Sequence, residues 1–166
     1  PFKITVDDKI YLCKALIVAT GASTRWLGMP SETALRGKGV SSCATCDGFF
    51  FKGQDVVVVG GGDTALEEAM YLANIVKSVT IVHRRDELRA SKELQKKVKA
   101  SSKISFVWNA VVSEIKDVSA GKVTAVILKD VKNGQVRELP CEGVFIAVGH
   151  EPNTAIFKGQ LKLDKK

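Results

Sequence analysis

The segment Asp55–Ala65, with the sequence DVVVVGGGDTA, decides the fold of this 166-residue chain. Its four consecutive valines are too uniformly apolar and β-branched for a half-exposed surface, so we predict a buried strand over 55–59. The glycines that follow fit the pattern G-x-G-x-x-A, and apolar residues at helical spacing as far as Val76 predict a helix over 63–76. A strand that passes through a glycine turn into a helix is typical of a nucleotide-binding βαβ unit.

The glycine turn has the chemistry that a dinucleotide requires. The first glycine permits a sharp turn, the second lets a pyrophosphate approach the backbone, and the small residue at the third position lets helix and strand pack closely. The free N–H groups and the dipole at the start of the helix attract phosphate. We therefore predict a phosphate-binding turn, with a plain strand–helix turn as the alternative. Its residues are Gly60, Gly61, Gly62, Asp63 and Thr64.

The end of the next predicted strand, 78–82, indicates which nucleotide is bound. An NAD site has a carboxylate there for the ribose 2′-OH. This chain instead has His83, Arg84 and Arg85, with Arg89 one helical turn farther on. Guanidinium groups suit a phosphate, so we assign these four residues to the site and predict the 2′-phosphate of NADP. The alternative is a solvated basic face that leads into the lysine-rich segment after it.

The remaining pattern predicts an α/β fold. We expect strands at 9–12, 15–19, 78–82, 104–108, 111–118, 123–131, 136–139 and 144–148, a helix at 86–100, and an irregular linker at 23–39. Asn133-Gly134 is a hairpin signal between two of these strands. The order β-α-β-α-β, then antiparallel strands, then a returning strand predicts a Rossmann-like three-layer nucleotide-binding sandwich, with a parallel sheet and an antiparallel β excursion.

Cys43 and Cys46 form a C-x-x-C pair at the start of a short predicted helix. Zinc sites of this type use two such pairs, and neither Cys13 nor Cys141 has ligand-like neighbours, so we predict no metal. A single C-x-x-C beside a βαβ unit favours a redox-active disulfide. Asp47 follows directly and could move a proton to or from a departing thiolate, although it could also be only a turn residue.

Composition narrows the classes of function. The chain is 45% hydrophobic and 26% charged, with a net charge of +7, so a packed core is expected. Aromatic residues do not interleave with the lysines of 92–99, and no apolar run approaches the ~20 residues of a membrane helix, so we expect neither nucleic acid nor membrane as a partner. Since the chain starts with Pro1 and shows no signal peptide, we expect an internal piece of a longer, cytoplasmic protein.

Five motifs occur in an order that resembles the low-molecular-weight thioredoxin reductases of bacteria, which are of the pyridine nucleotide-disulfide oxidoreductase type. They are Ala19-Thr20-Gly21-Ala22, Cys43-Ala44-Thr45-Cys46-Asp47-Gly48, Gly60 to Ala65 with Glu67-Glu68-Ala69, His83-Arg84-Arg85-Asp86 with Arg89, and Gly149-His150-Glu151-Pro152-Asn153-Thr154. The resemblance covers nearly the whole chain.

The resemblance implies a homodimeric flavoenzyme whose NADPH domain is inserted into its FAD domain. Electrons would pass from NADPH to FAD, then to the Cys43–Cys46 disulfide, and then to thioredoxin, while the two domains rotate. By resemblance, Cys46 would face the flavin, Cys43 would attack thioredoxin, and Asp47 would be the proton-transfer acid. Arg84, Arg85 and Arg89 would bind the 2′-phosphate.

The resemblance also divides the chain. Residues 1–24 would be a remnant of the FAD-binding domain with a linker, 25–149 the NADPH-binding domain with the C-x-x-C, and 150–166 the return to the FAD-binding domain. The FAD-binding glycine motif that opens full members is absent, so we expect a chain that binds NADPH, lacks a complete FAD site, and is inactive as a reductase by itself.

Three alternatives compete with this interpretation. One is the NADH-dependent flavoprotein reductase of a peroxiredoxin system, against which Arg84 and Arg85 argue. Another is a non-catalytic NADP-binding module in which Cys43 and Cys46 only sense redox state. The weakest is a zinc-binding module.

Overall fold

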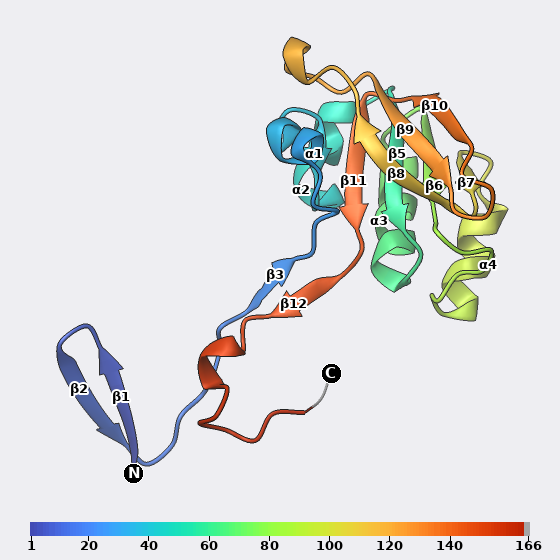
Figure 1. Ribbon diagram of the computed structural model, residues 1–166. Coiled ribbons are helices and arrows are strands. Elements are labelled where there is room, and N and C mark those ends of the chain that lie inside the picture. Colours follow the sequence, from blue (N-terminus) through green and yellow to red (C-terminus); the bar gives the residue numbers. More distant parts are fainter. Residues whose placement is uncertain (165–166) are drawn as a thin grey trace. The chain divides into compact units, whose positions relative to one another are not determined.

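The structure is a computed structural model that describes residues 1–164 and divides into two compact units (Figure 1). Unit 1 is formed by Pro1–Ser23 together with the segment from Glu151 onward, and unit 2 by Thr24–His150. Unit 1 contains the antiparallel hairpin of β1 (Phe2–Val6) and β2 (Lys9–Cys13). At the boundary between the units, β3 (Ala22–Thr24) pairs with β12 (His150–Pro152).

A five-stranded parallel sheet is the centre of unit 2. Its strand order is β4-β11-β5-β6-β7, and each neighbouring pair runs parallel. The strands are β4 (Val40–Ser41), β5 (Asp55–Gly60), β6 (Ser78–Val82), β7 (Ile104–Val107) and β11 (Gly143–Ala147). Strand β11 comes from far along the chain and inserts between β4 and β5, as the predicted returning strand requires.

Unit 2 has three layers (Figure 1). Helices α2 (Ala44–Asp47), α3 (Asp63–Ala73) and α4 (Lys92–Ala100) belong to the core on one face of the parallel sheet. The other face packs on α1 (Pro30–Leu35) and on an antiparallel sheet of order β10-β9-β8, with β8 (Ala110–Ile115), β9 (Ala125–Asp130) and β10 (Val136–Pro140). The predicted three-layer α/β sandwich with an antiparallel excursion is therefore confirmed.

The valine run of β5 explains why this layering forms. Val56 and Val58 lie in the core shared with α3, whereas Val57 and Val59 lie in the core shared with the antiparallel sheet. Successive side chains of a strand point to opposite faces, so a strand covered on both faces has to be apolar at every position. All four valines are buried.

The helix predicted over 86–100 is shorter in the structure, since α4 begins only at Lys92. Residues 86–91 form a loop because their backbone N–H groups bond to the glycine turn instead of to a preceding helical turn: Arg89 and Ala90 both donate to the carbonyl of Gly61. The Ser91 side chain then caps α4 by accepting from the N–H of Leu94. The prediction of a helix start at Asp86 was wrong for this reason.

Two further predictions need correction. The apolar run at 15–19 is not a strand, and Ile17 is 91% exposed. Among the residues described in unit 1, only two-stranded pairs are present, and these offer no second layer to cover such a run. The segment 23–39 is not wholly irregular either, because it contains α1 and belongs mostly to unit 2.

The other predicted elements of unit 2 are confirmed, with bounds that differ by a few residues in several of them. Strands β8 and β9 end before the predicted residues 118 and 131, and α3 ends at Ala73 rather than at 76. The predicted hairpin between β9 and β10 is present, and its loop contains Asn133 and Gly134, of which Gly134 has a φ of 75°. None of the helices within residues 1–164 is long and apolar enough to cross a lipid bilayer.

Candidate functional site

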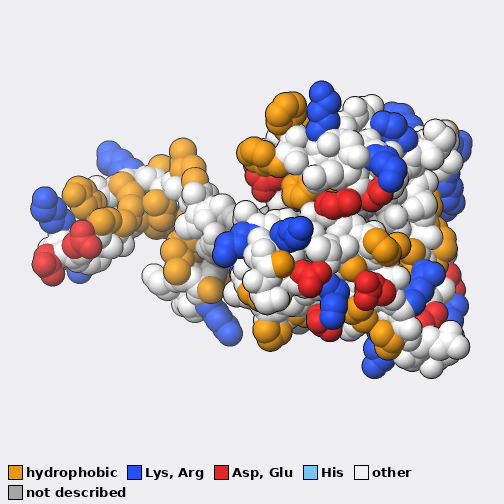
Figure 2. All heavy atoms as spheres, turned by 90° about the horizontal axis from the view of Figure 1, so that it is seen from above, with side chains coloured by type: hydrophobic (Ala, Val, Ile, Leu, Met, Phe, Trp, Pro, Cys, Tyr) orange, Lys and Arg blue, Asp and Glu red, His pale blue; other side chains and the backbone are white. Residues whose placement is uncertain are grey.

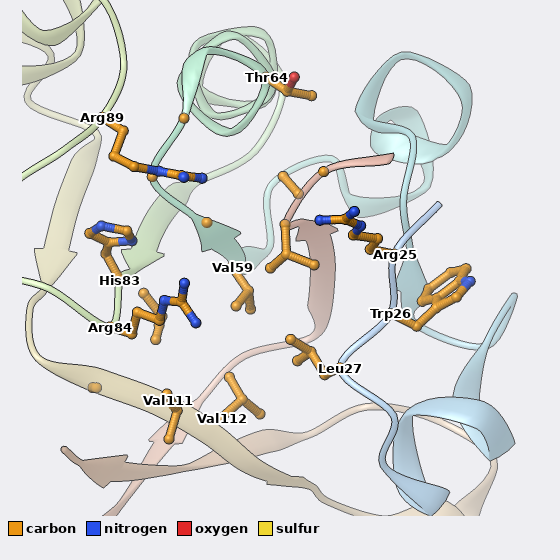
Figure 3. A pocket seen from close by; sticks show the side chains of 18 residues that line it. Arg25, Trp26, Leu27, Val59, Thr64, His83, Arg84, Arg89, Val111 and Val112 are labelled. Atoms are coloured by element: carbon orange, nitrogen blue, oxygen red, sulfur yellow. The ribbon is translucent and has the colours of Figure 1, made fainter. Parts of the chain in front are cut away.

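A cavity of about 540 Å³ lies in unit 2 at the carboxyl ends of β5, β6 and β11 (Figure 3). Ligands of open α/β sheets bind in the crevice outside these strand ends. The lining includes Gly60, Gly61, Gly62 and Thr64 of the glycine turn, Val82 at the end of β6, His83, Arg84 and Arg89 after it, and Val148 and Gly149 after β11. The structure therefore brings most of the predicted nucleotide-site residues into one place.

Neighbouring atoms lie so close to two glycines of the turn that a side chain would not fit there. A Cβ at Gly60 would meet the carbonyl oxygen of Ala147 and the side chain of Ala65, and a Cβ at Gly61 would overlap the imidazole of His83. At Gly62 a Cβ would meet nothing within 4 Å. Gly60 and Gly61 thus allow strand, helix and loop to pack together, while Gly62 faces open space beside the first turn of α3, where a phosphate has room.

The arginines after β6 do not all face the cavity. All three arginines are exposed, but only Arg84 and Arg89 line the cavity, from the side of β6, whereas Arg85 does not. The backbone carbonyl of Arg85 accepts a 3.2 Å hydrogen bond from the N–H of Asn109. Asp63 is also outside the lining, and its carboxylate accepts from the N–H of Ser91 at 2.9 Å. Asp63 therefore fastens the 86–91 loop to the start of α3.

His83 is a buried polar residue of the cavity lining. Its Nε2 atom has no hydrogen-bond partner among the described residues. Burial lowers the pKa of His83 below its ordinary value, and the cations Arg85, Arg89 and Arg84 lower this pKa further, while a hydrogen bond with the Glu87 backbone opposes the shift. The imidazole is therefore neutral at neutral pH, and its unpaired Nε2 atom is enclosed by the protein.

The opposite wall of the cavity is formed by Arg25, Trp26 and Leu27 (Figure 3). The backbone N–H of Arg25 donates to the carbonyl of Gly149 at 2.9 Å, which ties this wall to the end of β11. Sequence reasoning missed these residues because they lie in the segment that we expected to be a linker. The one sequence feature that could have indicated this wall was Trp26, a large aromatic residue close to Gly28 and Pro30.

Cys43 and Cys46 form a disulfide, with an S–S distance of 2.04 Å and a Cα–Cα distance of 5.3 Å. Cys43 precedes α2, and its sulfur accepts from the N–H of Cys46 at 3.2 Å. Cys43 is half-buried and Cys46 is exposed. Neither cysteine lines the nucleotide cavity, so the two parts of the predicted site are separate.

A buried hydroxyl organises the residues around this disulfide. Ser41 donates to a carboxylate oxygen of Asp47 at 2.6 Å and accepts from the N–H of Cys43 at 3.0 Å. Because Ser41 lies on β4, within the parallel sheet, it holds the disulfide loop and the carboxylate of Asp47 against a rigid element. Sequence reasoning missed Ser41, since a serine two residues before a cysteine carries no distinctive signal.

Glu68 on α3 is a second carboxyl group close to the disulfide helix. It is half-buried, and its Oε2 atom has no hydrogen-bond partner among the described residues. Burial raises the pKa of Glu68 to about 7, although a hydrogen bond from the Ala44 backbone partly lowers it. The carboxyl group beside the first residue of α2 is thus poised to change its charge near neutral pH.

Two phenylalanines expose their rings directly after the C-x-x-C. Phe49 is 72% exposed and Phe50 is 76% exposed, both on the short 3₁₀ helix Gly48–Phe51. Phe51, by contrast, is buried and packs edge-to-face on Phe145 at a centroid distance of 5.2 Å. Aromatic residues exposed beside a reactive group are typical of a protein-interaction surface.

The other two cysteines, Cys13 and Cys141, are not disulfide-bonded. Cys141 is buried, and burial raises the pKa of its thiol to about 12. Within residues 1–164, no three His, Cys, Asp or Glu side chains group together to hold a metal ion. On the face shown in Figure 2, basic and acidic side chains of the larger unit are intermixed.

Comparison with known proteins agrees with this architecture. Thioredoxin reductase of Streptomyces clavuligerus is 59% identical over 163 residues, covering 96% of this chain and 50% of that protein. A Pseudomonas fluorescens protein named glucosaminate ammonia-lyase is 53% identical over 166 residues, covering 98% of this chain and 51% of that protein. The crystal structure of Lactococcus lactis thioredoxin reductase has a TM-score of 0.90 at 43% identity, covering 98% of this chain and 54% of that one.

The chain spans about half the length of the curated relatives it matches. A family model described as pyridine nucleotide-disulphide oxidoreductase matches residues 2–166, which is nearly all of the sequence. Together with the parallel sheet, the glycine turn and the disulfide in one unit, this match identifies the chain as a member of the pyridine nucleotide-disulphide oxidoreductase family.

Proposed function

We propose that this chain is the NADPH-binding and disulfide-bearing part of a thioredoxin-disulfide reductase, which passes electrons from NADPH through FAD to the Cys43–Cys46 disulfide and then to thioredoxin. One observation carries the proposal: a single unit combines a cavity lined by arginines with a formed C-x-x-C disulfide that lies outside that cavity. This separation is expected if a further carrier moves electrons between the two.

The residues of the cavity fit NADPH. The glycine turn and the first N–H groups of α3 would hold the pyrophosphate, and Arg84 and Arg89 would bind the 2′-phosphate by charge-assisted hydrogen bonds. The imidazole of His83 belongs to the same lining and packs against Gly61 of the glycine turn. NADPH, when bound, supplies a hydride, and the walls of the cavity orient its two halves.

The disulfide fits thiol–disulfide exchange. Two electrons and two protons convert the Cys43–Cys46 disulfide to a dithiol; one thiolate then attacks a sulfur of the thioredoxin disulfide, and the other resolves the mixed disulfide. Asp47, whose carboxylate accepts a hydrogen bond from Ser41, would exchange a proton with these thiols. The exposed rings of Phe49 and Phe50 would contact the partner protein.

FAD belongs in this proposal to the longer protein. Residues 1–164 contain one strand–glycine turn–helix unit, which we assign to NADPH, and we assign unit 1 to pieces of the FAD-binding domain. We further propose that the longer protein is a cytoplasmic homodimer, as the resemblance implies. The isolated chain is then a nucleotide-binding and thiol-exchanging piece without reductase activity of its own.

The proposal can be tested on the purified chain by four measurements. We expect no stoichiometric flavin absorbance, binding of NADPH in calorimetry, and no reduction of the disulfide by NADPH alone. After reduction with dithiothreitol and removal of the reagent, the chain should transfer two electrons to oxidised thioredoxin. A reduced chain that fails to reduce thioredoxin, although Cys43 and Cys46 react with a thiol reagent, would refute the proposed partner.

A further inference from the structure

Glu32 is a completely buried carboxylate that binds two successive backbone N–H groups. It lies on α1 with 0% exposure. One of its oxygens accepts from the N–H of Leu27 at 2.9 Å, and the other accepts from the N–H of Gly28 at 2.9 Å. Gly28 has a φ of 85°, so the chain turns sharply where its N–H groups bond to the carboxylate.

Arg36, one helical turn after Glu32, extends this contact to a tryptophan. Its Nη2 atom lies 3.4 Å from a carboxylate oxygen of Glu32, and its guanidinium carbon lies 3.8 Å from the centroid of the Trp26 ring. A cation over an aromatic face is attracted by the ring. Glu32 and Arg36 therefore hold both the backbone and the side chain of one short segment, 26–28.

Helix α1 is itself fixed to the rest of unit 2. The hydroxyl of Ser31 accepts from the N–H of Ile115 on β8 at 3.1 Å, and Leu35 is fully buried in the core beneath the antiparallel sheet. Removing a carboxylate from water is unfavourable unless hydrogen bonds and a cation compensate, as they do here. An apolar residue could fill the same space without the free-energy cost of desolvating a charge. The presence of Glu32 therefore indicates that the protein requires the backbone conformation of 26–28, which its carboxylate stabilises.

The segment held by Glu32 is a wall of the nucleotide cavity. Trp26 and Leu27 line the cavity together with Arg25. In Figure 3 these three residues lie across the cavity from Arg84, His83 and Arg89, with Val59 between the two groups. The wall is therefore remote from the residues that we assign to the 2′-phosphate.

This arrangement indicates which half of the nucleotide meets the wall. In NADPH the 2′-phosphate belongs to the adenosine half, and the pyrophosphate joins that half to the nicotinamide half. With the 2′-phosphate on Arg84 and Arg89 and the pyrophosphate on the glycine turn, the nicotinamide half extends to the opposite wall. We propose that Glu32 is a positioning residue that fixes the 25–28 wall and so provides the binding energy for the nicotinamide half, an inference that rests on the proposed function.

The affinity for a fragment of NADPH distinguishes a role of Glu32 in positioning the wall from a general role in stabilising the fold. Adenosine 2′,5′-bisphosphate carries the 2′-phosphate and adenosine but lacks the nicotinamide half. The experiment measures the affinity of the 166-residue chain for NADPH and for adenosine 2′,5′-bisphosphate by calorimetry, in the wild type and in Glu32→Gln. The matched control is Glu142→Gln, since Glu142 also accepts from a backbone N–H, that of Asp55, at the opposite end of β5 from the glycine turn.

In Glu32→Gln the amide nitrogen cannot accept, so one of the two N–H groups loses its partner. We expect a roughly tenfold loss of NADPH affinity, because an unsatisfied buried donor has an effect of this size. The affinity for adenosine 2′,5′-bisphosphate should change by less than about twofold, and Glu142→Gln should change neither affinity. Equal losses for both ligands, or no loss for either, would overturn the assignment of Glu32.

The wild-type measurements keep this inference distinct from the function on which it rests. If the wild type bound neither ligand, the NADPH site itself would be refuted. If it bound both ligands equally well, the site would stand, and the wall would contribute nothing, which would overturn the role of Glu32.

Arg36→Met decides the outcome if Glu32→Gln does not fold. This change keeps the aliphatic stem but removes the charge that contacts Glu32 and Trp26. We expect a weaker loss of NADPH affinity, about threefold, with unchanged binding of adenosine 2′,5′-bisphosphate. A loss of the same size for both ligands would contradict the proposal.

Discussion

The hydroxyl of Ser41 donates a 2.6 Å hydrogen bond to the carboxylate of Asp47, and the same oxygen accepts from the N–H of Cys43. One buried side chain on β4 thus joins the proposed proton-transfer group to the first cysteine of the disulfide. The position of the Asp47 carboxylate is thus set by the parallel sheet and not only by the C-x-x-C loop.

Replacing Ser41 with Ala should therefore affect both stability and exchange. Removal of the hydroxyl leaves the Cys43 N–H and the Asp47 carboxylate without this partner, which should cost about 1–3 kcal/mol in the free energy of unfolding measured with urea. The exchange rate of the reduced chain with oxidised thioredoxin should fall as well. Ser113→Ala, which removes an exposed hydroxyl bonded to Ile127, should leave both quantities unchanged. An exchange rate equal to wild type in Ser41→Ala would show that Asp47 needs no such support.

The arginines after β6 should differ in their effect on nucleotide selectivity. Arg84→Ala and Arg89→Ala each remove a guanidinium from the cavity, so NADPH affinity should fall roughly tenfold or more in calorimetry, while NADH affinity changes little. Arg85→Ala should have a clearly smaller effect, because Arg85 does not line the cavity. Equal losses of NADPH and NADH in Arg84→Ala would mean that this residue does not recognise the 2′-phosphate.

The contact of Gly61 with His83 should appear in a double-mutant cycle. Gly61→Ala introduces a methyl group where the imidazole lies, which should lower the free energy of unfolding by about 1–3 kcal/mol. His83→Ala opens that space, so the double variant should be more stable than the sum of the two single losses predicts. Strictly additive losses in urea unfolding would show that the two side chains do not compete for the same volume.

Glu68 should make stability depend on pH. Its pKa in the folded chain is raised from 4.5 to about 7 by burial, so the folded state prefers the neutral acid. This contribution to stability is fully present below pH 4.5 and is lost as the pH rises through about 7. Glu68→Gln, which cannot ionise, should thus match the wild type at pH 4.5 and exceed it at pH 8 by on the order of 1 kcal/mol, since solvent screens part of the effect. A constant difference across this pH range in urea unfolding would contradict the raised pKa.

The two cysteines should differ in their access to a partner. The resemblance assigns the attack on thioredoxin to Cys43, but in this structure Cys46 is exposed and Cys43 is half-buried. For the isolated chain we therefore expect Cys43→Ser, which keeps Cys46, to form a mixed disulfide with oxidised thioredoxin faster than Cys46→Ser does. Rates can be followed by non-reducing gel electrophoresis. Faster trapping by Cys46→Ser would support the order of attack that the resemblance implies.

Sequence reasoning identified the elements whose signals are local. The valine run, the glycine turn and the apolar face of α3 each carry their own pattern, because a strand buried on both faces and a helix buried on one face differ in period. The C-x-x-C and the arginines after β6 are likewise short motifs. The structure places Arg84 and Arg89 at the cavity, as the position at the end of β6 predicts.

What the sequence could not reveal depends on contacts between distant segments. Residues 86–91 have a helical pattern, but the Gly61 carbonyl and the Asp63 carboxylate bind their N–H groups, so the segment stays a loop. The wall at Trp26 and Leu27 is similar: its conformation comes from Glu32 and from the end of β11, which lies more than 100 residues farther along the chain. The prediction of a buried strand over 15–19 was wrong because the expected contacts are missing. An apolar run is buried only where a second layer covers it, and these residues are exposed.

The central claim is that this chain carries an NADPH site selected by the arginines after β6, and it is tested most directly by the affinities of the purified wild-type chain for NADPH and NADH. Both should be measured by calorimetry at one ionic strength, because phosphate contacts weaken with salt. We expect NADPH to bind roughly a hundredfold more tightly than NADH, from two guanidinium contacts to the 2′-phosphate. Equal affinities, or tighter binding of NADH, would contradict the account.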